Sequence, residues 1–304
     1  MSYKNEKKNA PVKPATEKAP SITYYSKDQT ECPICNARFK REELMSGGGR
    51  MIAGTLTDEL RRLYEPSAKY GEIFPLVYTI TVCPKCHYAA FPQDFCILDK
   101  ESLNRIYEKM QTRFTSVKRL FSHLNFTSTR TLNEGAASYY LAILCYEGVD
   151  VKYSPTIKQG VCALRAAWLF SELGEKYPEE NYTYVADLFY RKALFFYRHA
   201  VELETSGKEM IANLKSFGPD IDKNYGYDGV LYLAALLEYK YGSRQDPQKR
   251  QELLVYHRRT LAKLFGLGKS SKNKPGPLLE HARSLYDTIV AEINDDDDDD
   301  DDDE

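Results

Sequence analysis

The chain has 304 residues, of which 42% are hydrophobic and 28% charged, a composition typical of a soluble globular protein with room for two domains. No stretch reaches the roughly 18 consecutive apolar residues that a membrane-spanning helix needs. The net charge of -2 hides an asymmetry, because Asp295 to Glu304 is an unbroken acidic run. Without these ten of the 44 acids, 42 basic residues face 34 acidic ones. We expect a basic body and, at 294–304, an acidic tail that self-repulsion keeps disordered.

The first 21 residues are rich in Lys, Ala and Pro and contain no apolar run. They lack the apolar region of a secretory signal, so we expect a disordered leader at 1–21. With no export signal, the expected compartment is the cytoplasm, which is reducing. Paired cysteines there are more often metal ligands or redox groups than disulfides.

The segment 22–98 is organised around two Cys-x-x-Cys turns, Cys32-Pro33-Ile34-Cys35 and Cys83-Pro84-Lys85-Cys86. Each turn can direct two soft thiolates at one ion, and four thiolates complete a tetrahedral zinc site. The connection at 36–82 is longer than the roughly 15 to 20 residues of common ribbons, but its extra closure entropy costs only about 1 kcal/mol. We predict a zinc-ribbon-like module at 22–98 with one structural Zn²⁺. The predicted ligands are Cys32, Cys35, Cys83 and Cys86.

Strand-forming residues lead into both turns, at 22–31 and at 74–82, where β-branched and aromatic side chains are frequent. Between them, Thr57 or Asp58 can cap a short helix over 59–64. The triple glycine at 47–49 lacks the Gly-Lys-Ser/Thr ending of a phosphate-binding loop and is interpreted as a flexible turn.

Three other chemistries remain open for these cysteines. The run from Cys83 to His87 matches the c-type haem attachment motif, although that chemistry needs export and the sister turn continues with Asn36. Cys-Pro-x-Cys also resembles the glutaredoxin active site, which needs a helix N-terminus. The sequence also does not distinguish zinc from iron held by four cysteines in a rubredoxin-like site. His87 and Cys96 are the nearest additional ligand candidates, but we expect His87 to point away and Cys96 to be a buried apolar thiol.

From residue 99 the hydrophobic period changes to about 3.6, which predicts helices. The expected helices are 103–121 as one helix or a broken pair, 132–147, 155–174, 181–204, 228–241, 247–265 and 278–293. One window fits the tetratricopeptide template, with no second copy in register. Its residues are Leu173, Gly174, Tyr177, Ala186, Tyr190 and Ala193. The predicted fold class is α+β, mostly α: a small β zinc-ribbon module, then an α-helical tetratricopeptide-like array at 99–293. A plain helical bundle is the alternative.

Catalytic motifs are not evident: the sequence contains no Ser/His/Asp signature, no HExxH and no complete phosphate loop. A four-cysteine shell leaves no open position at the metal. We therefore expect a non-enzymatic intracellular zinc-binding adaptor whose helical domain binds a protein or peptide. One alternative is a nucleic-acid-binding ribbon protein. Its candidate bases are Arg50, Arg61 and Arg62 between the cysteine turns, with Arg258, Arg259 and Lys269 to Lys274 near the other end of the chain. The other alternative is a thiol-based redox or metal-responsive switch.

The segment around the second turn resembles a known family. Phe74 to Tyr78, Val82 to Cys86, Tyr88 to Phe91 and Asp94-Phe95, with Cys32 to Cys35 and Phe39, resemble the bacterial family of domain of unknown function 2225, from residue 24 to about 200. The resemblance implies a cytosolic bacterial protein with a paired-CxxC metal site and a tetratricopeptide-like part, and no known activity. His87 stands where the family often has glycine, and the Asp-rich tail lies outside the pattern.

Overall fold

The computed structural model describes residues 21–211, 214, 218–266 and 274–299. The leader at 1–20, parts of the expected loops at 205–227 and 269–277, and the end of the tail at 300–304 lie outside the described residues. In the described part, helices dominate and the strands form only two-stranded sheets. The predicted class, α+β and mostly α, is confirmed.

The N-terminal part contains four antiparallel pairs of strands, β1–β4, β2–β3, β5–β6 and β7–β8. The strands are β1 (Thr23–Tyr25), β2 (Thr30–Glu31), β3 (Arg38–Phe39), β4 (Glu42–Leu44), β5 (Ile52–Leu56), β6 (Arg62–Glu65), β7 (Thr81–Val82) and β8 (Ala89–Ala90). Two of these pairs, β2–β3 and β7–β8, enclose the two Cys-x-x-Cys turns.

Two local expectations in this part are wrong. The segment 59–64 forms no helix: residues 57–61 turn the chain between β5 and β6, and 62–64 belong to β6. Leu60 in this turn adopts a φ of +59° with its side chain fully buried. Of the strand expected at 74–82, only Thr81–Val82 is β, because Pro75–Tyr78 forms the 3₁₀ helix η1. Pro75 stands at the start of η1, where its missing N–H costs nothing, and the buried Leu76 and Val77 override strand propensity.

The helices follow the predicted pattern closely. They are α1 (Lys100–Glu108), α2 (Met110–Leu120), α3 (Leu132–Tyr146), α4 (Pro155–Lys176), α5 (Tyr182–Thr205), α6 (Gly226–Tyr241), α7 (Pro247–Phe265) and α8 (Gly276–Asp299), with a 3₁₀ turn η2 (Val151–Tyr153) before α4. The helix at 103–121 is the broken pair α1 and α2. Helix α8 continues beyond its expected end at Ile293, since a helix that is already nucleated propagates easily.

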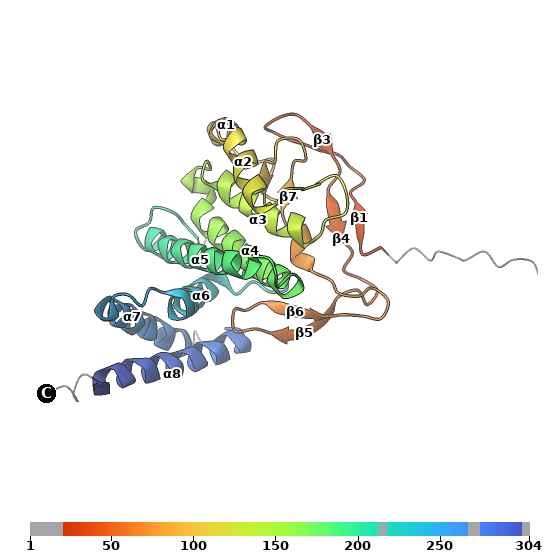
Figure 1. The fold of residues 1–304 in the computed structure, drawn as a ribbon. Coiled ribbons are helices and arrows are strands. Elements are labelled where there is room, and N and C mark those ends of the chain that lie inside the picture. Colours follow the sequence, from red (N-terminus) through yellow and green to blue (C-terminus); the bar gives the residue numbers. More distant parts are fainter. Residues whose placement is uncertain (1–20, 212–213, 215–217, 267–273, 300–304) are drawn as a thin grey trace, which may run out of the picture.

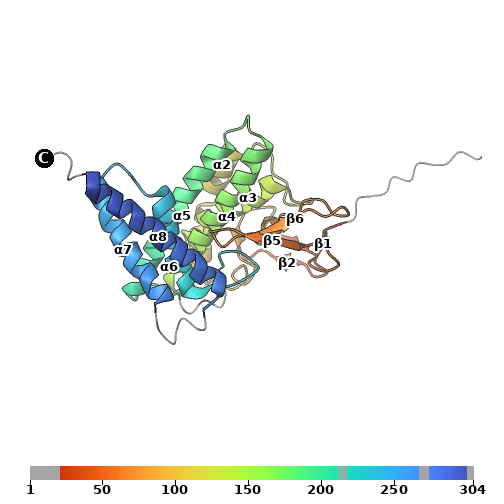
Figure 2. The ribbon, with the colours of Figure 1, turned by 90° about the horizontal axis from the view of Figure 1, so that it is seen from below.

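Figure 1 shows helices α3 to α8 following one another in chain order, with the β elements along one side. Each helix in this series packs against the next, and Figure 2 shows α6, α7 and α8 gathered at one end. Helices α4 and α5 approach closely near their connection: a Cβ on Gly174 would lie 2.6 Å from Thr183 Oγ1. A tetratricopeptide-like array needs such small residues, although that classification stays a prediction.

The β part and the helices share one continuous apolar core, which extends from Cys32 to Ile293. A buried ion pair crosses the junction, with Lys158 Nζ on α4 2.7 Å from Asp94 Oδ2. The Tyr146 hydroxyl on α3 donates to the same carboxylate at 2.6 Å. These contacts fix the part of the chain that carries the cysteine turns against α3 and α4.

Candidate metal centre

The two cysteine turns have the same backbone geometry. In the first, Cys32 N donates to Ala37 O and Asn36 N donates to Cys32 O, both at 2.9 Å. In the second, Cys83 N donates to Tyr88 O at 2.8 Å and His87 N to Cys83 O at 2.9 Å. The residue after each second cysteine takes a left-handed conformation, with φ of +57° at Asn36 and +53° at His87. This repeat presents both thiols of each turn to the same side.

The four sulfur atoms meet in one cluster, all within 4.8 Å of one another. Cys32 Sγ lies 3.6 Å from Cys86 Sγ, and Cys35 Sγ lies 3.6 Å from Cys83 Sγ. A tetrahedral zinc ion with bonds of about 2.3 Å separates its sulfur ligands by about 3.8 Å. A disulfide would need about 2.05 Å, so these are free thiols at metal-ligand spacing. The cluster could hold a metal ion.

The protonation of the cluster also favours a cation. Hydrogen bonds from Cys32 and Cys86 lower the pKa of Cys83 to about 2. The hydrogen bond with Cys83 raises the pKa of Cys32 to about 12, and hydrogen bonding to Cys32 and Cys83, followed by burial, raises that of Cys86. Without a cation, Cys83 is therefore the favoured thiolate, and Cys32 and Cys86 favour their protonated forms. A divalent ion at its centre would stabilise four.

The two additional candidates lie outside this cluster, which is the one such group in the described ranges. The His87 ring contacts Phe114 and Phe126, with centroids 4.5 and 5.5 Å away, so it points away from the sulfurs as expected. Cys96 is exposed, and the expectation of a buried thiol is wrong. The turn around it directs its neighbour Phe95 into the core instead.

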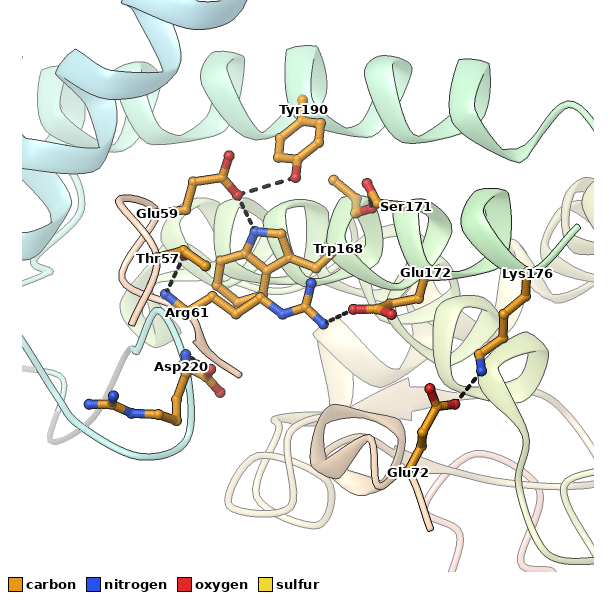
Figure 3. Close-up of polar contacts among 12 residues, drawn as sticks. Thr57, Glu59, Arg61, Glu72, Trp168, Ser171, Glu172, Lys176, Tyr190 and Asp220 are labelled. Atoms are coloured by element: carbon orange, nitrogen blue, oxygen red, sulfur yellow. Dashed lines mark hydrogen bonds and ion pairs between the residues drawn. The ribbon is translucent and has the colours of Figure 1, made fainter. Parts of the chain in front are cut away.

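Sequence reasoning missed a second site, where the turn between β5 and β6 meets the helices. The Glu59 carboxylate accepts hydrogen bonds from Trp168 Nε1 at 2.5 Å and from the Tyr190 hydroxyl at 3.2 Å, as Figure 3 shows. Lys240 Nζ lies 3.1 Å from the same side chain. Acids on a turn and a lone Trp on a helix carry no signal that they will meet, because more than 100 residues separate them in the chain.

A cleft of about 460 Å³ opens beside Glu59. Its charged walls are largely paired: Arg61 Nη2 lies 2.6 Å from Glu172 Oε1, and Lys176 pairs with Glu72 (Figure 3). We interpret the cleft as a polar junction that fixes the β5–β6 pair onto α4 and α5.

Of the basic residues considered for nucleic-acid binding, the three between the cysteine turns are engaged. Arg61 pairs with Glu172, and Arg62 Nε lies 3.2 Å from Asp222 Oδ2. Arg50 Nη1 donates to Gly47 O at 2.6 Å within the glycine turn. These three side chains bind protein groups and do not form a free basic face.

The fold and the cysteine cluster together define the class of protein. It is a mostly helical protein with two Cys-x-x-Cys turns, whose four cysteines form one candidate metal site. The chain belongs to the family described as "Uncharacterized protein conserved in bacteria (DUF2225)", which matches residues 24–289. An "Uncharacterized protein" of Borreliella burgdorferi is 43% identical over 275 residues, 90% of this chain and 98% of that protein. No solved structure matches. The match extends the resemblance seen up to about residue 200 across most of the helical part.

None of the helices in the described part of the chain combines the length and apolar character needed to cross a membrane.

Proposed function

We propose that this protein is a non-enzymatic, cytoplasmic adaptor in which a structural Zn²⁺ ion holds the β part together and the helical part binds another protein. The proposal of a structural zinc ion is based on the four sulfur atoms, which lie at metal-ligand spacing. Four cysteines fill a tetrahedral shell and leave no position for a reacting water, so the ion would stabilise the fold without taking part in a reaction.

The observation that supports protein binding is an apolar stripe on α5. Tyr184, Leu188 and Phe195 have exposed fractions of 64%, 44% and 55%. Spacings of four and seven residues bring them onto one face of the helix, because each residue turns the helix by about 100°. The opposite face, with Ala186 and Ala193, packs in the core. Exposed aromatic and aliphatic side chains along one line are typical of protein interfaces.

The test uses affinity capture with the full-length, metal-loaded protein. We expect Leu188→Ser combined with Phe195→Ser to abolish recovery of the partner seen with wild type, with metal content and helix content unchanged. Lys263→Ser, at an exposed position on α7 and outside the stripe, is the matched control. Equal recovery by all three proteins, or no partner with wild type, would contradict the adaptor function. Metal release on mild peroxide treatment, accompanied by loss of the partner, would favour a redox switch instead.

A further inference from the structure

A groove of about 620 Å³ lies between helices α5, α6 and α7. Its lining is predominantly apolar and includes Val201, Leu231, Ala234, Leu253 and Tyr256. Volumes of about 300 to 1,000 Å³ with apolar walls are typical of small-ligand sites. The groove does not include the stripe on α5, and the inference drawn from it goes beyond the adaptor function.

Polar groups with unused bonding capacity gather at this groove. His257, which is 3% exposed, lines it, and the buried Nε2 of His257 has no hydrogen-bond partner among the described residues. Arg198 also lines it, with Nη1 3.7 Å from Oε2 of the buried Glu238, a separation too long for a hydrogen bond. Lys249, on the rim, is exposed and forms no ion pair within the described part of the chain.

The charges at this place favour an anion. Arg198 and Lys249 both lie near Glu238, and burial raises the pKa of that carboxyl despite these cations. Glu238 is not part of the lining, and the acid that lines the groove is Glu202. Glu202 is a surface side chain that lies 3.3 Å from His199 Nδ1 and 3.8 Å from Arg198 Nε. The guanidinium of Arg198 and the ammonium of Lys249 lie beside an apolar groove. They match a ligand that has a carboxylate at one end and hydrocarbon along its length.

We propose that the groove binds an aliphatic carboxylic acid. Its chain lies against Val201, Leu231 and Leu253, and its carboxylate lies between Arg198 and Lys249. Burial of the chain supplies most of the affinity, because it removes apolar surface from water, while the two cations select the sign of the head group.

The experiment is isothermal titration calorimetry of full-length, metal-loaded protein with dodecanoate below its micelle concentration. We expect one binding site per protein chain. Dodecylammonium has the same hydrocarbon chain with the opposite charge, and its affinity should be lower by a factor of about ten or more. Lys249→Glu should weaken dodecanoate binding about tenfold. Lys263→Glu, an exposed change on the same helix outside the groove, should leave the affinity unchanged.

A second variant tests the apolar part of the site. Ala234→Leu places a larger side chain on the wall of the groove and should abolish dodecanoate binding, with circular dichroism verifying that the helices are retained. No binding of dodecanoate to wild type overturns the proposal. Equal binding of both amphiphiles, or equal effects of Lys249→Glu and Lys263→Glu, also overturns it. Binding of an apolar peptide without binding of dodecanoate would assign the groove to a protein partner and overturn it as well.

Discussion

Glu59 and Trp168 lie 109 residues apart in the sequence, and the Glu59 carboxylate accepts a 2.5 Å hydrogen bond from the Trp168 indole nitrogen. Glu59 is buried, and Leu60 beside it is fully enclosed. The turn between β5 and β6 therefore inserts one apolar side chain, Leu60, and one charged side chain, Glu59, into the helical body. The long connection between the cysteine turns is thus anchored on the helical body.

Glu59→Ala is expected to lower the free energy of unfolding by about 2 to 3 kcal/mol, because buried donors on Trp168 and Tyr190 lose their acceptor. Lys240 loses one of its two carboxylate partners and keeps Asp58, 2.8 Å away. Trp168→Phe keeps most of the ring packing and should cost less. Urea denaturation of both variants checks this. Glu65→Ala, an exposed acid on β6, is the control. If Glu59→Ala is no more damaging than Glu65→Ala, the turn is not an anchor.

The buried Lys158–Asp94 pair predicts a non-additive response. Lys158→Met alone leaves the Asp94 carboxylate buried without its cation and should destabilise the protein by about 3 to 5 kcal/mol. Adding Asp94→Asn to Lys158→Met should restore part of that loss, since no unpaired charge remains and the Tyr146 hydroxyl keeps an acceptor. Thermal or urea unfolding of the two single variants and the double variant measures the coupling. Simple addition of the two single effects would refute it.

His87 is expected to be replaceable without loss of metal. Its φ of +53° favours glycine or asparagine, and Asn36 occupies the equivalent place in the first turn. His87→Asn should retain full metal content and change stability by no more than about 1 kcal/mol, since gained turn preference offsets lost contact with Phe114. His87→Val should destabilise by about 1 to 2 kcal/mol, because a β-branched residue resists the left-handed conformation. Metal loss in His87→Asn would instead make this side chain a ligand.

Stability should fall in mild acid through His257. Burial, with a smaller contribution from Arg198, lowers the pKa of this imidazole from 6.5 to about 4. The unfolded chain thus takes up a proton at higher pH than the folded one, and the contribution of the neutral ring is complete above pH 6.5 and lost progressively as pH falls towards 4. Its size is of the order of 3 kcal/mol. The difference in unfolding free energy between wild type and His257→Leu, measured by urea titration from pH 7 to 4.5, should shrink or reverse as the pH falls. A constant difference would contradict the buried neutral imidazole.

The sequence was most informative where structure depends on neighbours in the chain. The four cysteines were predictable because a Cys-x-x-Cys turn fixes its geometry within six residues, and the helices because apolar periodicity persists over several turns. The segments 59–64 and 74–82 were assigned wrongly, because long-range burial of Leu60 and Leu76 decides their conformation against local propensity. The contact of Glu59 with Trp168 leaves no local trace, and neither does the convergence of Arg198, Glu238 and His257 beside one groove.

Metal analysis of the purified protein tests the central claim most directly, with Cys32→Ser and Cys83→Ser compared against Cys96→Ser, a control at an exposed cysteine outside the cluster. Four thiolates at this spacing predict about one zinc per chain in wild type and Cys96→Ser. Both cluster variants should lose the metal and several kcal/mol of stability, since structural zinc contributes on the order of 10 kcal/mol to small domains. Metal-free wild-type protein in which the four cluster thiols can be titrated would contradict a structural metal centre. One iron per chain would mean that the site holds iron and not zinc.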